Sequence, residues 1–326
     1  MIHQLSYSVY QDISVFGSDP VSAVASMGFD SVEMLTSYDR PDPSLRDICG
    51  SVHLPYAVDW LAAWEGRALD LPEDSLLYHS YGRNRDDVVS NIRKAIEAAS
   101  VLDPPYMVFH ACNADTPEIM RRTYTRSDAD VVRALCEMLN DVVSSFPGGE
   151  PPSRILLENL WWPGLRLLDD SGFRILERNL EFDDWGINLD TGHLMSCLPV
   201  STEEEAIEAL ERVFDRYPSD MIDRIDAVHL HWSATWSYRS SFEEHGYEPP
   251  FEDFIRRAYA HVSMMDRHLP FTDSRCTELV EMLYPKTITH ETPGSVNGFL
   301  EDSRAQRSLF SFRFQPMIEE SRIRGV

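Results

Sequence analysis

The sequence lacks the features that mark membrane, secreted and nucleotide-binding proteins. No apolar run reaches the roughly 18–20 residues of a membrane-spanning helix, and no basic segment followed by an apolar one opens the chain, which predicts no signal peptide. The five cysteines are scattered without a CxxC spacing, as is typical of free thiols in a reducing cytoplasm. No GxGxxG or GxxxxGK(S/T) motif indicates a nucleotide site. We therefore expect a cytoplasmic protein with no membrane partner.

Lysine is also scarce. The 326 residues include two lysines against 27 arginines, and the formal net charge is −25. Because DNA-binding proteins usually present a basic face to the phosphates, this charge argues weakly against a nucleic-acid partner. Hydrophobic residues make up 43% of the chain, which is enough for a large core.

Short apolar runs alternate with amphipathic stretches along the whole chain. Eight runs are predicted strands, at residues 2–9, 29–35, 49–54, 106–109, 154–158, 185–190, 225–230 and 287–290. Helices are predicted between them, at 20–27, 87–102, 128–143, 202–217 and 274–284, with a closing helix after Ser303. No repeat or composition break divides the chain. The pattern predicts an α/β fold in which residues 1–326 form a single (β/α)8 TIM barrel.

Two segments interrupt this rhythm. Residues 56–86 follow the third strand as a long irregular segment, and residues 232–265 follow the seventh; both are rich in aromatic side chains. Connections of this length in a compact domain are usually lids or binding loops. We expect two lid insertions over a covered pocket. For residues 232–265 the alternative is an interface between the subunits of a homodimer.

Residues that commonly bind metals stand at the ends of successive predicted strands. Glu158 and Asp190 each end a buried apolar run, and His193 follows Asp190 by three positions. The corresponding ends of four other strands carry His53, His110, His229 and Glu291. Because the carboxyl ends of parallel strands face one cleft, these side chains predict a divalent-metal site. Taken singly, Glu158 as a helix cap and Asp190 as part of a turn are equally good interpretations.

Seven short motifs carry these residues. They are His-Leu-Pro-Tyr (53–56), Val-Phe-His (108–110), Leu-Leu-Glu-Asn (156–159), Leu-Asp-Thr-Gly-His (189–193), Val-His-Leu-His (228–231), Asp-Arg-His-Leu-Pro (266–270) and Glu-Thr-Pro (291–293). These motifs span almost the whole chain, and in their residues and order the sequence resembles the xylose-isomerase-like TIM barrels. That superfamily includes sugar-phosphate isomerases and epimerases as well as endonuclease IV (AP endonuclease family 2). The resemblance implies a core metal ion, Zn or Mn, bound by Glu158, Asp190, His229 and Glu291.

The resemblance leaves two chemistries open. Isomerases and epimerases use one metal ion and two glutamates that move a proton between adjacent carbons, here Glu158 and Glu291. Endonuclease IV-like members hydrolyse phosphoesters with a three-zinc cluster, whose remaining ligands would be His53, His110, His193, Asp266 and His268. The aromatic insertions and the acidic surface favour isomerisation or epimerisation of a small sugar or sugar phosphate. A zinc-cluster phosphoester hydrolase is the alternative, so the expected partner is a small carbohydrate or a phosphate ester.

Three further residues are expected to contact the substrate. His231 lies one strand period after His229, so it faces the barrel mouth or packs beneath a lid. Trp161 begins a Trp-Trp pair shortly after Glu158, which is either a sugar-stacking platform or a filler of the barrel rim. Tyr56 ends the first motif and opens the first insertion.

Several other positions leave alternatives open. Glu243 and His245 are an alternative acid–histidine pair to Asp266 and His268. Glu33, near the end of the second strand, could bind substrate or cap a helix. His290 precedes Glu291, so its side chain should point toward the helices. The lysines that would hold a phosphate are missing, and four arginines of the insertions could replace them: Arg67, Arg83, Arg85 and Arg239.

Overall fold

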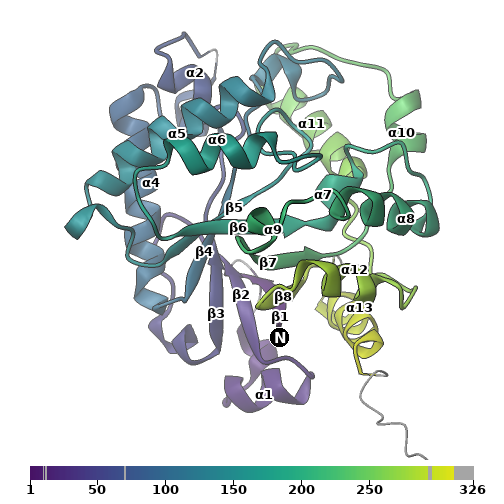
Figure 1. Ribbon diagram of the computed structural model, residues 1–326. Helices are drawn as coiled ribbons and strands as arrows, with labels where there is room; N and C mark the ends of the chain where they lie inside the picture. The colour runs from purple at the N-terminus through teal and green to yellow at the C-terminus, as the bar shows by residue number, and fades with distance from the viewer. Residues whose placement is uncertain (10, 12, 70, 293–295, 312–326) are drawn as a thin grey trace, which may run out of the picture.

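Eight parallel strands form a closed barrel in sequence order (Figure 1). The computed structural model describes residues 1–9, 11, 13–69, 71–292 and 296–311. The strands are β1 (Ile2–Ser8), β2 (Ser31–Leu35), β3 (Cys49–His53), β4 (Tyr106–His110), β5 (Arg154–Glu158), β6 (Trp185–Asp190), β7 (Ile225–Leu230) and β8 (Thr287–His290). Each strand pairs with the next, and β8 pairs with β1 to close the barrel. The predicted TIM-barrel fold is confirmed.

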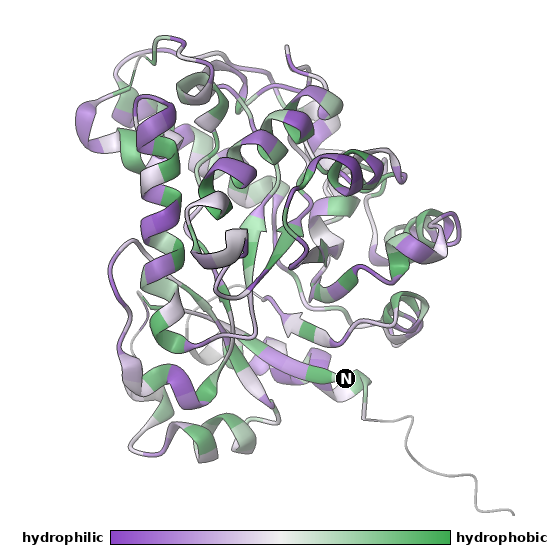
Figure 2. Cartoon of the chain, turned by 60° about the vertical axis from the view of Figure 1, so that its left-hand side comes forward, coloured by the Kyte–Doolittle hydropathy of each residue, from purple (hydrophilic) through white to green (hydrophobic). Residues whose placement is uncertain are grey.

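Helices surround the strands. The longer ones are α1 (Pro20–Ser26), α4 (Arg85–Ala99), α5 (Asp128–Ser144), α6 (Ser171–Asn179), α8 (Glu203–Phe214), α12 (Cys276–Leu283) and α13 (Val296–Leu309). Side chains of Asn84, Ser127 and Thr202 accept hydrogen bonds from backbone N–H groups and so fix where α4, α5 and α8 begin. Figure 2 shows apolar and polar residues alternating along these helices, as expected where one face packs on a barrel.

The closing helix begins earlier than predicted. Helix α13 starts at Val296 instead of after Ser303, and residues 312–326, which the prediction also covered, lie outside the described residues. Short helical segments fill other connections: η1 (Ile13–Phe16), η2 (Pro43–Ile48), η4 (Ser100–Leu102), η5 (Thr116–Glu118), η6 (Pro147–Gly149), α7 (Thr191–Met195) and α9 (Ser219–Ile222).

The interior of the barrel holds an apolar layer beneath a polar one. Tyr106, Val108, Leu156 and Ala227 form a small buried cluster, while the main apolar core lies between the strands and the helices. The side chain of Gln4 accepts hydrogen bonds from Ser51 at 2.7 Å, Tyr106 at 3.2 Å and Thr289 at 3.3 Å. These contacts tie opposite strands together and give the strand ends a rigid base.

Both insertions contain helices. Residues 56–86, predicted as irregular, form α2 (Trp60–Trp64), η3 (Glu73–Ser75) and α3 (Leu76–Ser80). Helices of five residues span too little sequence to show an amphipathic period, so the sequence pattern missed them. Residues 232–265 form α10 (Trp236–Ser241) and α11 (Phe251–Met265). Helix α11 packs on the segment after β5 through a second cluster that includes Leu160, Trp161, Trp162, Phe254 and Ala258.

All five cysteines are free thiols, as predicted. None of the helices in the described part of the chain combines the length and apolarity that crossing a bilayer demands. The cytoplasmic location stays a prediction.

Candidate metal centre

Four residues from consecutive strand ends meet at the mouth of the barrel. Glu158 and Asp190 are the last residues of β5 and β6, His229 is the last but one of β7, and all three are buried; Glu291 directly follows β8. Each offers a ligand atom, and these atoms lie within 4.8 Å of one another, close enough to share an ion. Pro293, the last residue of the Glu-Thr-Pro motif, lies outside the described residues.

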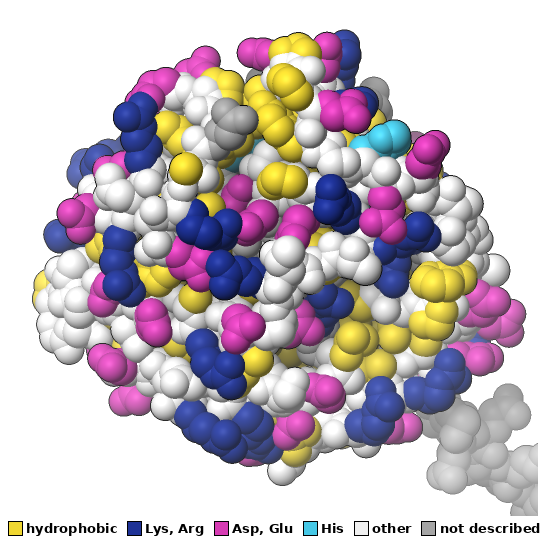
Figure 3. Space-filling model, turned by 90° about the horizontal axis from the view of Figure 1, so that it is seen from above, with side chains coloured by type: hydrophobic (Ala, Val, Ile, Leu, Met, Phe, Trp, Pro, Cys, Tyr) yellow, Lys and Arg dark blue, Asp and Glu magenta, His cyan; other side chains and the backbone are white. Residues whose placement is uncertain are grey.

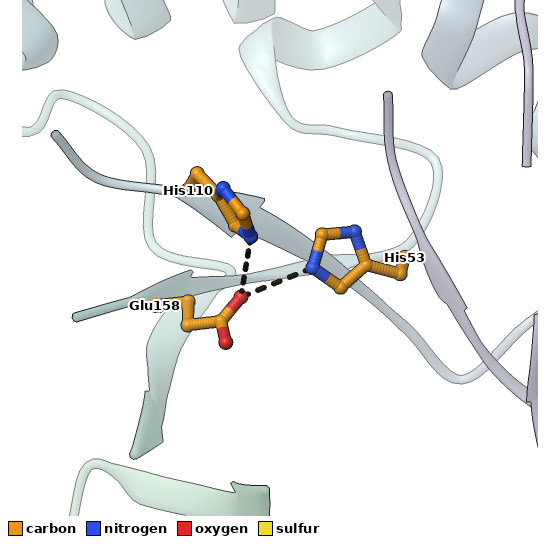
Figure 4. A group of neighbouring side chains, drawn as sticks. All are labelled: His53, His110 and Glu158. Atoms are coloured by element: carbon orange, nitrogen blue, oxygen red, sulfur yellow. Dashed lines mark hydrogen bonds and ion pairs between the residues drawn. The ribbon is translucent and has the colours of Figure 1, made fainter. Parts of the chain in front are cut away.

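A second group, formed by His53, His110 and Glu158, shares Glu158 with the first (Figure 4). The two imidazoles converge on Oε2 of Glu158, with Nε2 of His53 at 3.1 Å and Nε2 of His110 at 3.2 Å. Oε1, the other oxygen of Glu158, lies 3.1 Å from Nδ1 of His229. Glu158 therefore links the two groups through its two oxygens, and it caps no helix.

A third group, formed by His193, Asp266 and His268, lies on the other side of Asp190. Oδ2 of Asp266 is 3.2 Å from Nε2 of His193 and 3.3 Å from Nε2 of His268. Asp190 also caps α7, because its Oδ1 accepts a hydrogen bond of 2.6 Å from the backbone N–H of His193. Oδ1 of Asp190 thus stabilises the turn that the sequence offered as an alternative, and Oδ2 faces the metal-ligand candidates.

His231 is buried inside this third group. Its Nε2 lies 3.0 Å from Oδ2 of Asp190 and 3.9 Å from Oδ1 of Asp266, and it can share an ion with Asp190 and His193 or with Asp266 and His268. These are the surroundings of a metal ligand, and the contact of His231 with substrate that was expected from sequence stays a prediction. Glu243 and His245 belong to none of these groups, so Asp266 and His268 are the pair that reaches the site.

Two histidines are oriented as metal ligands usually are. Nδ1 of His53 lies 2.9 Å from the carbonyl oxygen of Leu54, and Nδ1 of His193 lies 2.9 Å from that of Asn159. A carbonyl only accepts, so these Nδ1 atoms carry a proton, and each Nε2 faces a carboxylate oxygen. A proton or a metal ion on Nε2 is needed to avoid repulsion between its lone pair and that carboxylate. Donor sets of this kind fit divalent metals.

His229 is fully buried, like Asp190 and His231. Neither of its ring nitrogens has an aligned hydrogen bond, although Nε2 lies 2.8 Å from Oε1 of Glu33 and Nδ1 lies 3.0 Å from Oε2 of Glu291. Burial alone lowers the pKa of His229, but the carboxylates of Glu33, Glu158 and Glu291 outweigh it and hold this pKa well above its usual range. The pocket around His229 therefore attracts positive charge.

Burial and neighbouring charges also act in opposite directions on the pKa of other residues of the site. Burial lowers the pKa of His268, yet Asp266 and Glu291 raise it overall to about 9. Burial raises the pKa of Glu158, but His229 and His110 hold it well below its usual range. The metal-free site thus carries ionised carboxylates beside histidines that bind protons in place of metal ions.

Two residues that position ligands were not identified from sequence. The side chain of Asn159 accepts a hydrogen bond from Asp190 N at 2.8 Å and donates one to Asp190 O at 3.0 Å, which joins the ends of β5 and β6. Glu33 neither caps a helix nor lines the cavity; it is buried inside the barrel against Ser51 and His229. An acid within a five-residue apolar strand was the signal, since such a charge needs a partner.

His290 lies on the outside of the barrel, as predicted. Its Nε2 is 3.0 Å from Nδ1 of His3, and its Nδ1 is 3.0 Å from the side-chain nitrogen of Gln306 on α13. The alternation of side chains along β8 therefore sends His290 toward the helices while Glu291 reaches the site.

Two connected cavities open over the metal-ligand candidates. The first, of about 310 Å³, is lined by residues that include His53, His110, Glu158, Asp266, His268 and Glu291. The second, of about 490 Å³, shares Tyr56, His110, His193, Asp266 and His268 with it and extends between the two insertions. Figure 3 looks onto the side of α2 and α11 and shows hydrophobic side chains gathered there among acidic and basic ones.

Tyr56 and Trp161 both lie at the cavity wall. The ring of Tyr56 stacks on His110 with centroids 4.4 Å apart, and Trp161 meets His193 edge to face at 5.2 Å. Trp161 also belongs to the buried cluster under α11, so it fills the rim and lines the cavity at once. Their expected contact with substrate stays a prediction.

The four arginines considered for phosphate binding lie elsewhere. Arg67 pairs with Asp115 at 2.6 Å, Arg83 pairs with Glu73, and Arg85 lies over the ring of Trp64 at 3.7 Å. Arg239 donates to the carbonyl of Ser196. No Arg or Lys is among the described residues that line the two cavities. A phosphate in this site would depend on metal ions for its counter-charge.

The family model of the xylose isomerase-like TIM barrel matches residues 21–309. Among curated proteins, none matches.

Several solved structures have a similar fold. A D-tagatose 3-epimerase-like protein has a TM-score of 0.54 at 16% identity, covering 96% of this chain and 98% of its own. L-ribulose 3-epimerase has a TM-score of 0.51 at 11% identity, with coverages of 95% and 94%. Endonuclease IV from Thermus thermophilus has a TM-score of 0.49 at 16% identity, with coverages of 96% and 100%. At such identities the likeness concerns the fold.

Proposed function

The chain belongs to the xylose isomerase-like TIM barrel family, and from that premise we propose that it is a multinuclear divalent-metal enzyme that hydrolyses a small phosphate ester. One observation carries the proposal: the four-residue group around His229 adjoins further groups of potential ligands on both sides, linked through Glu158 and Asp190. A single-metal enzyme needs only the central group. The geometry therefore favours the hydrolase that the sequence left as the alternative.

The orientation of the outer histidines supports this choice. If one ion sufficed, His53, His110, His193, Asp266 and His268 would serve as substrate-binding groups. However, Nε2 of His53 and Nε2 of His193 each lie within 3.2 Å of a carboxylate oxygen, and their Nδ1 atoms face carbonyls. Both nitrogens of each ring are thus engaged, and neither is free for a sugar hydroxyl.

Each residue then has a stated role. Glu158, Asp190, His229 and Glu291 are the central ligands, His53 and His110 complete a second site with Glu158, and His193, Asp266 and His268 form a third, to which His231 adds a donor. Mixed imidazole and carboxylate ligands suit Zn or Mn. Ions bound there supply a Lewis acid that lowers the pKa of water and neutralises phosphate charge. Burial of the ligands excludes bulk water, which strengthens these electrostatic interactions.

Charge explains why the number of ions matters. Three divalent ions would outweigh the charge of the four carboxylates Glu158, Asp190, Asp266 and Glu291, so the site would attract a phosphate ester. A single ion would supply only two positive charges against these four carboxylates, which suits a neutral sugar better than an anionic ester. The net charge of −25 and the cavity between the insertions argue for a small ester in preference to duplex DNA.

Isomerisation or epimerisation of a sugar remains the second candidate. Glu158 and Glu291 both approach Nδ1 of His229, at 3.1 and 3.0 Å, so both border the central group as a proton-transferring pair would. The absence of Lys and Arg from the described cavity lining also suits an uncharged sugar. In this case one ion occupies the central group, and Glu158 and Glu291 exchange the proton.

Metal content and activity measured together separate the two. Protein purified without chelator should contain two or three Zn or Mn ions per chain and hydrolyse 4-nitrophenyl phosphate or its diester, and Glu158→Gln should lose both properties. Glu137→Gln, an exposed change on α5, is the control. One ion per chain with epimerisation of a ketose would establish the second candidate instead, and robust nicking of abasic-site DNA would extend the substrate to nucleic acid.

A further inference from the structure

The larger cavity differs in chemistry from the metal-ligand candidates beside it. Away from those residues, its wall consists largely of apolar side chains: Ile119, Leu160, Trp162, Ile255, Ala258 and Val262. They come from the segments after β4 and β5 and from α11. None of these six, apart from the indole N–H of Trp162, can hydrogen-bond to a sugar hydroxyl or to a second phosphate.

Apart from the tyrosines at the cavity mouth and the metal-ligand candidates, the polar side chains of this wall are few and mostly occupied. Thr36 is buried, and its hydroxyl donates to the carbonyl of His53 at 3.3 Å. His79 meets Phe251 edge to face at 5.2 Å, and burial lowers its pKa, so it stays neutral. A polyhydroxylated group placed here would lose its hydrogen bonds to water without replacing them, which costs free energy.

Three tyrosines border the same cavity. Tyr56, Tyr78 and Tyr259 line it and are 45%, 59% and 63% exposed, which places them among the most exposed large hydrophobic residues of the described chain. They come from three separate places: the loop after β3, helix α3 and helix α11. Aromatic side chains from different elements around one opening are suited to holding a flat ring by its faces.

We propose that this cavity binds a planar apolar ring carried by the substrate, so that the substrate is an aryl or arylalkyl phosphate ester whose phosphate lies at the metal-ligand candidates. The proposal rests on the proposed function for the phosphate and on the cavity wall for the ring. The two cavities share Tyr56, His110 and Asp266, so one molecule can occupy both. Their combined size exceeds what a lone monosaccharide needs and falls in the range of drug-sized ligands.

A nucleobase is the competing planar group. Its edge carries several donors and acceptors, which the apolar wall would leave unpaired at the cost of an unmade hydrogen bond for each. An unsubstituted aromatic ring has no such requirement. The wall therefore favours an apolar ring over a base.

Binding of non-hydrolysable phosphonates to the metal-loaded protein tests the ring without the effect of leaving-group reactivity. Isothermal titration calorimetry should show benzylphosphonate binding at least about tenfold more tightly than methylphosphonate, because the ring leaves water for an apolar wall. Val262→Trp, which fills the cavity, should abolish the preference and leave methylphosphonate binding unchanged. Arg256→Trp, an exposed position on the same helix, is the matched control.

A second variant guards against misfolding of the first. Tyr259→Ala removes an exposed ring at the cavity mouth and should reduce the preference severalfold, whereas Tyr284→Ala, an exposed tyrosine at the end of α12, should not. Equal affinities for benzylphosphonate and methylphosphonate in the unaltered protein would overturn the ring site. Tighter binding of the phosphonate analogue of AMP than of benzylphosphonate would assign the cavity to a base and overturn the proposal as well.

The ring site and the hydrolase fail in different ways. Benzyl alcohol carries the ring without a phosphate, and ligand-observed NMR should detect its binding to the unaltered protein and to Arg256→Trp but not to Val262→Trp. That pattern together with no hydrolysis of any phosphate ester would remove the proposed function while the ring site stands. Hydrolysis of esters without any ring preference would do the reverse.

Discussion

Oε1 of Glu33 lies 2.8 Å from Nε2 of His229, on the opposite side of the imidazole from Glu158 and Glu291. The contact crosses the barrel from β2 to β7. It directs Nδ1 of His229 toward the two glutamates and favours a proton on Nε2, which leaves Nδ1 free to bind a metal. Carboxylates placed behind a histidine in this way orient the ring and raise its basicity.

The first prediction concerns this carboxylate. Glu33→Gln should weaken metal binding by about 10- to 100-fold, the usual effect of removing a carboxylate behind a metal-binding histidine. Competition with a chromogenic chelator measures the change, and the fold should persist because glutamine keeps the volume. Glu97→Gln on the surface of α4 is the control. Unchanged affinity would show that Glu33 only fills the barrel.

The strand ends of this barrel could be predicted from sequence, and Glu33 shows where such prediction stops. Glu158, Asp190 and His229 stand at or next to the end of a short apolar run, so their position at the carboxyl ends of predicted parallel strands placed them at the mouth of the cleft. The partner of Glu33 depends on the tilt of the strands and on which interior positions face one another across the barrel. Neither the strand tilt nor the pairs of facing positions can be obtained from the order of residues along the chain.

The insertions mark a second limit. Helix α2 has five residues, all buried, and such a uniform short stretch resembles a loop or a strand as much as a helix. Helix α11 has 15 residues and is long enough to show an amphipathic period. That Ala258 and Val262 face the cavity depends on how α11 packs over Trp161, which is a tertiary contact. His231 was recognised as facing inward, but its closeness to Asp266 depends on a loop that returns to the site.

The second prediction concerns the number of metal ions. His110→Ala should remove the ion held with His53 and Glu158 and lower the metal content by one ion per chain, because the central group keeps all four of its own ligands. Phosphate-ester hydrolysis should fall by more than about 100-fold, beyond what the loss of an indirect partner causes. Elemental analysis and kinetics provide the measurements. His245→Ala should change neither the metal content nor the rate of hydrolysis. Equal metal content in the two variants would contradict a separate metal site at His53, His110 and Glu158.

The third prediction is that metal affinity rises with pH. The pKa of His268 in the metal-free protein is raised from 6.5 to about 9, since Asp266 and Glu291 outweigh the effect of burial. Below that pH, a metal ion must displace this proton, so affinity should fall by about tenfold per pH unit for each proton displaced. Calorimetry in buffers of different ionisation enthalpy counts these protons.

The same shift predicts an opposite trend in stability without metal. Because folding raises the pKa of His268, its protonation stabilises the metal-free protein fully below pH 6.5, and this contribution is lost as the pH rises through about 9. The melting temperature of metal-free protein should therefore fall over this range, while that of metal-loaded protein does not. His268→Gln should reduce the fall in melting temperature of the metal-free protein between pH 6.5 and about 9. An unchanged slope in that variant would assign the effect to other groups.

The fourth prediction concerns Gly192, which allows His231 to pack closely. A Cβ at position 192 would lie 2.0 Å from Cε1 and 2.4 Å from Nδ1 of the His231 ring. Gly192→Ala must therefore displace His231 from Asp190 and should weaken metal binding in the third group. In Gly192→Ala with His231→Ala the clash is absent, so the two changes should couple by about 0.5–3 kcal/mol in unfolding free energy. Additive effects would mean that the ring is not what the methyl group meets.

The last prediction concerns the segment 232–265 as a lid. Phe254 on α11 is fully buried in the second cluster, against the segment after β5 and apart from the main core. Phe254→Ala should cost about 3–5 kcal/mol. Because this cluster is distinct from the main apolar core, the loss should act mainly on local opening of α11. Hydrogen exchange should accelerate within 236–265 while the strands keep their protection, and KM should rise. Phe173→Ala, a buried phenylalanine of the main core on α6, should instead lower the melting temperature of the whole domain. If Phe254→Ala turned a dimer into a monomer with turnover intact, the segment would be a subunit interface and no lid.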